Sequence, residues 1–373
     1  MKKIFITIPW FVPAFRAGGP VQSVANLVSE FNEGVEYYIY CGDTDLNGAE
    51  LENIRPNEWV PYNEWTRVWY ARPEKRSETL LKLVEKIQPE ILFIIGIFSW
   101  HFNIVPVIYC KSPRKILSTR GMLHPGALSQ KKWKKKIFLE LFKMLDYPFK
   151  VDFHATDEEE AGFILSYFGE PAKVFVAKNF PTKVGLLPMP EKEPGQLKMA
   201  TVAIISPIKN ILLVLEALQN MTDNIEYDIY GPIKDEDYWD LCKEQMRKLP
   251  RNISVLYHKE IEPSKVKEVL QATHVFILPS KSENFGHAMF EALSAGRPLI
   301  TSFTTPWKGL LEAKAGLNVS ENDVAALENA IHFFAQMSGE ELQKWSEAAH
   351  AYAEGKVNVE EIRGEYRGMF LGN

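Results

Sequence analysis

Cysteine is scarce in this sequence, with three residues among 373, at Cys41, Cys110 and Cys242. Their odd number and wide spacing exclude a disulfide framework and the close cysteine pairs of a zinc site, which makes a reducing compartment the default. Long apolar runs are missing too, because no stretch reaches the roughly 18 residues that a membrane span requires. We therefore expect a cytoplasmic protein, either soluble or peripheral on the inner face of the membrane.

Acidic residues are missing from one long stretch, although the whole chain carries a net charge of −5. Between Ile91 and Leu139 there are nine Lys or Arg residues and no Asp or Glu. A local basic surface on an acidic protein indicates an anionic partner. Nucleic acid is not expected as this partner, because the aromatic interleaving and the motifs of nucleic-acid-binding folds are absent.

The basic stretch ends in a cluster of cations around one tryptophan, namely Lys131, Lys132, Trp133, Lys134 and Lys135. With the apolar residues that follow, this cluster predicts an amphipathic basic helix over 131–145. Two interpretations stay open. Such a helix can lie against anionic lipid, or it can be an ordinary solvated helix whose apolar face packs into the core.

Short apolar runs alternate with amphipathic segments along almost the whole chain, which predicts doubly wound α/β architecture with parallel sheets. Prolines and glycines accumulate between 184 and 197, and we interpret this segment as an interdomain linker. We expect two Rossmann-like domains facing each other across a ligand cleft, at residues 1–183 and 198–349. A last helix, at about 350–373, is expected to pack back onto the first domain.

The strongest motif is the segment Ser280–Pro298, which follows a predicted strand and opens a predicted helix. Glu283 falls in the loop, and Glu291 falls about one turn inside the helix, on the same face as His287. Gly286 lets the backbone come close to a ligand, and the first amides of a helix are unpaired donors at its positive end. This arrangement can hold a diphosphate with a carboxylate on each side, and carboxylates suit ribose or sugar hydroxyls.

Two further loops follow strands and precede helices in the same way. In the first domain, Gly18 and Gly19 stand before Pro20, so the amides of this turn can meet a phosphate. In the second domain, Lys209 and Asn210 stand at a helix start, where the ammonium can neutralise a diphosphate leaving group.

Two other features have competing interpretations. Arg120 lies in a loop after a first-domain strand, where it can stabilise a phosphate or serve as a structural cation in a turn. Asp43 and Asp45 form a D-x-D pair of the kind that binds a divalent ion beside a diphosphate. Because this pair lies away from the other motifs, we interpret it as turn-capping chemistry and expect no metal.

The segment from Glu283 to Glu291 resembles the donor motif of the retaining GT-B glycosyltransferases of family four (group 1), in which two glutamates are separated by seven residues and Phe-Gly follows the first. The resemblance extends over nearly the whole chain, and it points to bacterial surface-polysaccharide members. It implies that Glu283, with the backbone of Phe285 and Gly286, holds the transferred sugar, and that Glu291 holds the ribose.

The same resemblance completes the expected site. Catalysis is expected to involve Glu283, Lys209 and Arg120. Donor contacts are expected from Gly18, Gly19, Lys209, Asn210, Gly231, Pro232, Glu283, Asn284, Phe285, Gly286, His287 and Glu291. The sequence departs from the family at Ile204, where relatives usually carry an arginine, and at Arg120, where many carry a histidine.

The expected function is transfer of a sugar from a UDP- or GDP-sugar to a glycan or polyprenyl-diphosphate-linked glycan acceptor, without metal or cofactor. Retention of configuration and a role in capsule, O-antigen or exopolysaccharide synthesis follow from the resemblance alone. Two alternatives stay open. Ile204 and Arg120 favour a non-catalytic sugar-nucleotide-binding protein. The other alternative is another enzyme on this scaffold: a nucleotide-sugar epimerase would need no acceptor and no basic membrane-facing helix, and a phosphorylase would rest on a pyridoxal cofactor, for which the sequence shows no distinct lysine.

Overall fold

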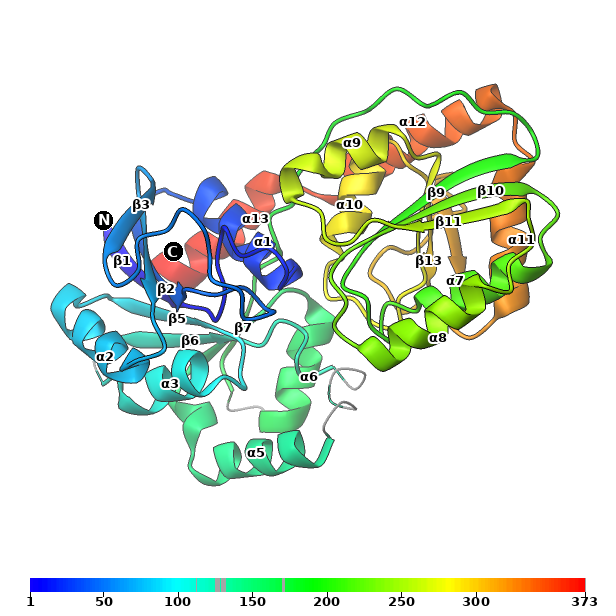
Figure 1. The fold of residues 1–373 in the computed structure, drawn as a ribbon. Coiled ribbons are helices and arrows are strands. Elements are labelled where there is room, and N and C mark those ends of the chain that lie inside the picture. The colour runs from blue at the N-terminus through cyan, green and yellow to red at the C-terminus, as the bar shows by residue number, and fades with distance from the viewer. Residues whose placement is uncertain (112, 125–127, 129–131, 170–171, 373) are drawn as a thin grey trace. The chain divides into compact units, whose positions relative to one another are not determined.

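The computed structural model describes residues 1–373 except 112, 125–127, 129–131, 170–171 and 373 (Figure 1). The chain divides into two compact units, which are described separately. The first contains Met1–Phe180 together with Val359–Asn373, and the second contains Pro181–Asn358.

In its described residues, the first unit is built on an eight-stranded sheet of order β3-β4-β2-β1-β5-β6-β7-β8. Neighbouring strands run parallel except for the edge pair β3 and β4. The strands are β1 (Lys2–Thr7), β2 (Val35–Gly42), β3 (Trp59–Asn63), β4 (Thr66–Ala71), β5 (Ile91–Ile95), β6 (Arg114–Ser118), β7 (Asp152–Ala155) and β8 (Val174–Val176). The helices are α1 (Gly19–Glu30), α2 (Arg76–Ile87), α3 (Val105–Tyr109), α5 (Lys132–Met144), α6 (Glu158–Phe168) and α13 (Val359–Leu371).

Helices cover both faces of this sheet, which explains why its strands read as continuous apolar runs. On one face, Phe93 of β5 packs against Phe370 of α13 at 5.4 Å between ring centroids, and Phe31, just after α1, packs against the same helix. On the other face, a core that includes Phe5 and Leu92 packs against α2, α3, α5 and α6.

The second unit has a six-stranded, fully parallel sheet of order β11-β10-β9-β12-β13-β14. The strands are β9 (Gln196–Val202), β10 (Asn224–Tyr230), β11 (Ile253–Tyr257), β12 (Val275–Leu278), β13 (Leu299–Ser302) and β14 (Gly316–Val319). The helices are α7 (Ile211–Ala217), α8 (Glu236–Met246), α9 (Val266–Gln271), α10 (His287–Ser294), α11 (Val324–Ala335) and α12 (Gly339–Lys356). Helices α7, α8 and α11 pack in the core on one face, and α9, α10 and α12 pack in the core on the other.

The segment expected as a linker, 184–197, lies along the second unit and includes the start of β9. Arg297 holds it there, because this fully buried guanidinium donates to the carbonyl oxygens of Pro188 at 2.6 Å and Leu270 at 2.7 Å. Burial lowers the pKa of Arg297 to about 10. The chain passes from the first unit to the second between Phe180 and Pro181, and it returns between Asn358 and Val359.

The prediction of two doubly wound, Rossmann-like α/β units is confirmed. The carboxyl ends of the parallel strands are where loops of such a fold bind ligands, so they are the places to look for a site. Of the helices that the structure describes, none combines the length and apolar character needed to cross a membrane.

Candidate functional site

Three loops meet at the carboxyl ends of β9, β12 and β13 in the second unit. The loop after β12 contains Ser280, whose hydroxyl donates to the Ile208 carbonyl at 3.0 Å in the loop after β9. The backbone amide of Lys281 donates to the same carbonyl at 2.8 Å. The carbonyl of Ser280 accepts from the hydroxyls of Ser302 and Thr304, with the Thr304 bond at 2.8 Å. These bonds join the three loops into one rigid edge.

Lys209 and Glu283 form an ion pair on this edge, although 74 positions separate them in the sequence. The Lys209 ammonium reaches the Glu283 carboxylate from the loop after β9, and their side chains are 21% and 10% exposed. The structure therefore brings together the two second-unit residues predicted to be catalytic. An ammonium held in place and still accessible can contact a bound anion without first becoming ordered.

Gly286 is the residue that caps the start of α10, and its conformation requires glycine. Its φ is 76°, and an added Cβ would lie 3.0 Å from the Met289 sulfur and 3.2 Å from the Trp307 indole nitrogen. The Trp307 indole in turn donates to the Phe285 carbonyl at 2.8 Å and packs against Phe290. Sequence reasoning gave Trp307 no role, yet this buried ring fixes the loop at the positive end of α10.

Glu291 lies one helical turn after His287 on α10 and is partly buried. Among the described residues, its carboxyl has no hydrogen-bond donor and no charged partner. Burial raises the pKa of Glu291 from 4.5 to about 7. A desolvated carboxyl with no partner in the protein is a candidate for contact with a ligand.

Replacing Glu291 by glutamine should make the free energy of unfolding fall less as the pH rises. Because the pKa is raised in the folded state, the stability linked to this proton is present below pH 4.5 and is lost as the pH rises through about 7. Glu291→Gln should therefore gain stability over the parent from pH 5 to pH 8, by up to about 3 kcal/mol. Urea unfolding of the parent and the variant at pH 5 and pH 8 measures this gain. The prediction is contradicted if the difference in midpoint between the two proteins is the same at both pH values.

Asn210 is the N-cap residue of the neighbouring helix α7, and its side chain is hydrogen-bonded within the protein. Its amide nitrogen donates to the carbonyl oxygens of Pro279 at 3.1 Å and Glu321 at 2.8 Å, and the residue is buried. The left-handed backbone at Asn210, with φ 60°, is one that asparagine tolerates well. A donor contact from this side chain stays a prediction.

The Gly231–Pro232 turn lies at the carboxyl end of β10, beside the loop after β11. The amide of Gly231 donates to the Lys259 carbonyl at 2.7 Å, and an added Cβ at Gly231 would lie 1.8 Å from the Ala203 carbonyl. Tyr230 and His258 stack beside this turn, with ring centroids 4.5 Å apart. A stacked aromatic pair next to a glycine turn can border a planar ligand such as a nucleobase.

In the first unit, the Gly18–Gly19 turn starts α1, so Pro20 is the second helical residue rather than the first. The chain just before this turn is held by Asp45, which accepts from the amides of Phe15 and Arg16 at 3.3 and 3.4 Å. Asp45 is buried and pairs with the Arg16 guanidinium at 3.4 Å.

The other carboxylate of the D-x-D pair, Asp43, pairs with Arg76 at 3.0 Å. Each aspartate therefore forms an ion pair with an arginine, whereas the sequence predicted only turn-capping. Nowhere in the described part of the chain do three or more His, Cys, Asp or Glu side chains gather as a metal site would require.

Arg120 is buried, with a left-handed φ of 50°. Its Nη1 donates to the side chain of Asn179, and the guanidinium lies beside the buried hydroxyl of Tyr366, although Nε and Nη2 make no hydrogen bond of good geometry among the described residues. The contacts with Asn179 and Tyr366 support a structural role, and the two poorly satisfied nitrogens support binding of an anion. Both interpretations of Arg120 stay open.

Glu160 of α6 holds the loop around Arg120, a role that sequence reasoning missed. Its carboxylate accepts from the Thr119 hydroxyl and the Gly121 amide, both at 2.5 Å, and from Thr156. Burial alone would raise the pKa of Glu160, but these donors outweigh it and lower the pKa. The N-cap of α6 is Asp157, whose carboxylate accepts from the Glu160 amide at 2.7 Å.

Some of the cations between Ile91 and Leu139 make contacts within the first unit. Arg114 pairs with Asp152 at 2.6 Å, and the Lys115 ammonium donates to the Val107 carbonyl at 2.8 Å. Within the predicted basic cluster, Trp133 and Lys134 are exposed on α5, and Lys135 lies over the Phe98 ring. Lys131 lies outside the described residues, and so does the side chain of Lys132, although its backbone belongs to α5.

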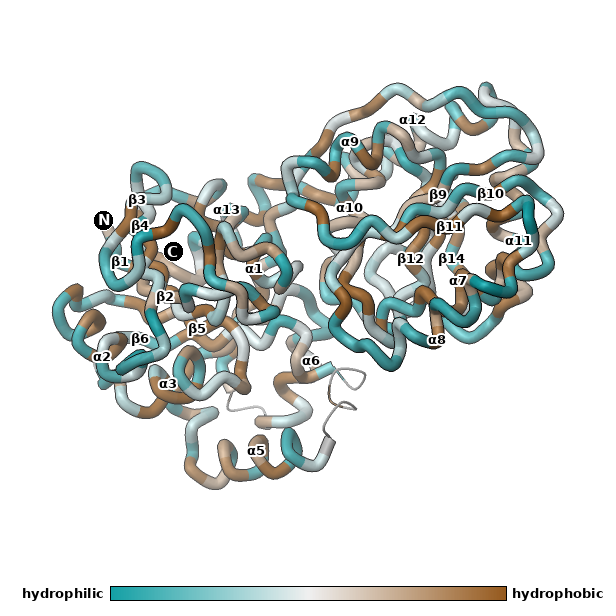
Figure 2. Tube along the Cα trace, viewed as in Figure 1, coloured by the Kyte–Doolittle hydropathy of each residue, from teal (hydrophilic) through white to brown (hydrophobic). Residues whose placement is uncertain are grey.

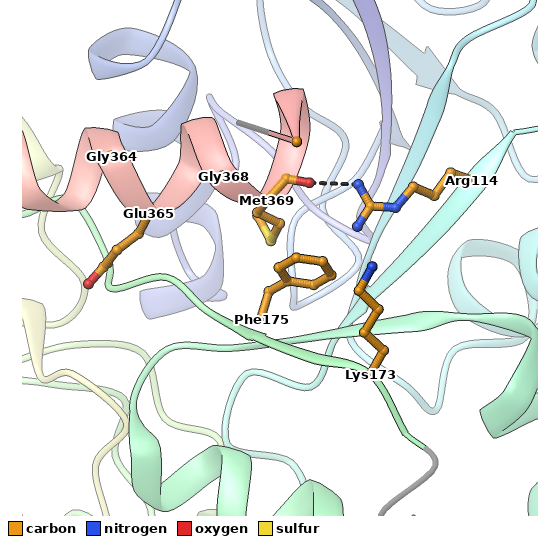
Figure 3. A pocket seen from close by; sticks show the side chains of 8 residues that line it. Arg114, Lys173, Phe175, Gly364, Glu365, Gly368 and Met369 are labelled. Carbon is orange, nitrogen blue, oxygen red and sulfur yellow. Dashed lines mark hydrogen bonds between the residues drawn. The ribbon is translucent and has the colours of Figure 1, made fainter.

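A hollow of about 480 Å³ lies elsewhere in the first unit, next to the last turns of α13 (Figure 3). Arg114, Lys173 and Phe175 line it, and Arg114 donates to the Met369 carbonyl at 2.7 Å. These residues lie at the amino ends of β6 and β8, so this hollow is not at the carboxyl edge where the predicted donor residues stand.

The second unit resembles known proteins in sequence. The family model described as "Glycosyl transferases group 1" matches residues 189–352. WcaL of Escherichia coli (strain K12), provisionally named a colanic acid biosynthesis glycosyltransferase, is 27% identical over 190 residues. That match covers 48% of this chain and 46% of WcaL, so the matched region is less than half the length of this relative.

Solved structures match over the whole chain. Sucrose-phosphate synthase from Thermosynechococcus elongatus has a TM-score of 0.72 at 17% identity, with 100% of both chains covered. HepE (Alr3699) from Anabaena, solved in complex with UDP and glucose, has a TM-score of 0.72 at 13% identity, again with 100% of both chains covered. At such identities the likeness shows the fold. The chain therefore has a GT-B fold, and its residues 189–352 match the model of the glycosyl transferases group 1 family.

Proposed function

We propose that this chain transfers a sugar from a nucleoside-diphosphate sugar to a glycan or polyprenyl-diphosphate-linked glycan, in the synthesis of a bacterial surface polysaccharide. One observation carries the proposal. An accessible Lys209–Glu283 pair and the unpartnered carboxyl of Glu291 lie in the loops and helix that follow β9 and β12. This edge falls inside the segment that matches the group 1 family.

Each residue of the edge has a proposed task. Lys209 neutralises the charge that develops on the leaving diphosphate, so that no metal is needed for this step. Glu283 and the backbone of Phe285 and Gly286 bind the transferred sugar, and Glu291 accepts the ribose hydroxyls. Further donor contacts are proposed from Gly18, Gly19, Gly231, Pro232, Asn284 and His287.

The donor and the acceptor are proposed from relatives. HepE was solved with UDP and glucose, and with UDP-glucose, which favours a uridine donor here. The name of WcaL refers to colanic acid, which favours a polysaccharide product. Retention of configuration rests on the likeness to family four.

A two-step experiment tests the proposal. Thermal unfolding is first measured with UDP, GDP, ADP and their sugars, and we expect one base to raise the midpoint. The matching labelled sugar donor is then incubated with polyprenyl-diphosphate-linked sugars in the presence of EDTA, and we expect label in the lipid fraction. No midpoint shift with any nucleotide, together with no transfer from any donor, would contradict the proposal.

Ile204 favours a second candidate, a protein that binds a sugar nucleotide without catalysis. This apolar, partly buried residue stands where family members usually carry a second cation for the diphosphate. In that case the midpoint shift occurs and no acceptor receives label. Conversion of the donor alone into an epimer would instead identify an epimerase.

A further inference from the structure

Apolar and polar residues alternate along helix α5 (Figure 2), and its apolar side chains are buried on one side of the helix and exposed on another. One side packs into the first unit. Leu139 and Phe142 are buried there, and Phe142 contacts Phe168 at 5.8 Å between ring centroids. Phe138 contacts Phe98 at 5.4 Å. These side chains satisfy the ordinary need of an amphipathic helix to bury one face.

The opposite side carries large apolar side chains exposed to solvent. Trp133 is 77% exposed, Ile137 58% and Met144 76%, and their spacing places them on one face of the helix, pointing away from the core. Leu141 lies on the same side of the helix, and Leu145 and Phe149, in the turn just beyond α5, are also exposed. We name these six residues the outer ridge. They are six of the sixteen exposed large apolar side chains in the described part of the chain, so exposed apolar side chains are concentrated in this short segment.

Lysines border the outer ridge, and one exposed acidic residue, Glu140, shares its face with Ile137 and Met144. Lys134, Lys136 and Lys143 are exposed on α5, and Lys150 is exposed just beyond it. From 132 to 150 the sequence contains two acidic residues, Glu140 and Asp146. An exposed apolar ridge bordered by lysines is complementary to a surface that offers both hydrocarbon and negative charge.

We infer that the outer ridge docks on an anionic lipid bilayer, with Trp133, Ile137 and Met144 inserted at the headgroup boundary and the lysines against lipid phosphates. A second copy of the chain fits less well, because two such ridges would bring their lysines together. The inference deepens the proposed function, since it would bring the first unit to a membrane where a polyprenyl-linked acceptor is found.

Vesicle flotation of the full chain tests this inference. The vesicles contain dioleoylphosphatidylcholine alone, or an equal mixture with dioleoylphosphatidylglycerol. We expect the chain to float with the anionic vesicles at low salt and to be released as salt rises. The variant Trp133→Ser/Ile137→Ser/Met144→Ser should lose this binding. Its matched control, Leu241→Ser/Leu256→Ser/Leu311→Ser, changes three similarly exposed residues of the second unit and should bind like the parent.

The charge contribution has its own variant, Lys134→Gln/Lys136→Gln/Lys143→Gln. It should weaken partitioning into anionic vesicles at least tenfold, because each lysine near an anionic surface contributes a severalfold increase. Since all changed residues are exposed, the thermal midpoints of the variants should equal that of the parent, which shows that they fold.

Three results would overturn the inference. The first is no flotation with either vesicle, and the second is equal flotation with both vesicles and no effect of the lysine variant. The third is concentration-dependent dimerisation, seen by sedimentation, that the Trp133 triple variant abolishes, because a second copy would then cover the ridge. Nucleotide binding is measured in parallel, so a failure of docking with intact nucleotide binding overturns this inference and leaves the proposed function standing.

Discussion

Replacing Lys209 by alanine should lower kcat/KM for sugar transfer by roughly 10²- to 10³-fold, the usual loss when one group that stabilises developing charge is removed. The Lys209 ammonium is held beside Glu283 and remains accessible, so it is ready to meet the leaving diphosphate. Its removal also leaves the Glu283 carboxylate without a cation next to an anionic substrate, which adds like-charge repulsion. Initial rates with labelled donor measure the change.

The control is Lys281→Ala, in the same edge. The Lys281 side chain is exposed, and its structural contact is made by its backbone amide, which the substitution retains. It should keep nearly parental activity. The double variant Lys209→Ala/Glu283→Gln separates loss of the catalytic charge from loss of folding. Removing the unpaired carboxylate should restore any stability that Lys209→Ala loses. Transfer should stay low, because the ammonium is still missing. If Lys209→Ala transfers sugar as fast as Lys281→Ala, the role given to this lysine is wrong.

Replacing Glu291 by alanine should weaken binding of the nucleotide sugar at least tenfold, because hydrogen bonds to a charged group contribute about 1.5–3 kcal/mol each. The carboxyl is partly buried with no partner in the described structure, so the ribose hydroxyls would be its donors. Isothermal titration of parent and variant measures the two affinities. The matched control is Glu312→Ala, which removes an exposed glutamate from the same unit.

The pH dependence of binding should follow the same carboxyl. With a pKa of about 7, Glu291 is mostly protonated at pH 6 and mostly ionised at pH 8. The ionised form accepts both ribose hydroxyls, so affinity of the parent should rise about tenfold between these values, with proton release on binding. A nucleotide sugar is the right probe, because its diphosphate does not titrate in this range. Glu291→Gln should lose the dependence, and a parent affinity that is flat or falls with pH would exclude the ribose contact.

Much of the fold could be predicted because parallel strands covered on both faces are nearly uninterrupted apolar runs. The strands β5 (Ile91–Ile95) and β12 (Val275–Leu278) are such runs. Two strands depart from this pattern. Strand β3 contains Pro61 and lies at the antiparallel edge of its sheet, and β14 is a short strand that starts with Gly316. Proline and glycine weaken the strand pattern in a sequence.

The pairing of Lys209 with Glu283 was within reach of sequence reasoning, because β9 and β12 are neighbours and their carboxyl ends share one edge. The bracing contacts of Asn210 and Trp307 were not, since they depend on which backbone carbonyls the loops present. The outer ridge of α5 was also beyond reach. Both sides of that helix carry apolar residues, and the periodicity does not say which side packs.

The most direct test of the central claim is a crystal structure of the chain with its nucleotide sugar. We predict the diphosphate at the Gly286 end of α10, within hydrogen-bond distance of the Lys209 ammonium, and the ribose hydroxyls on the Glu291 carboxylate. A nucleotide bound away from the edge formed by the loops after β9 and β12, or bound there with its ribose turned away from Glu291, would contradict the account.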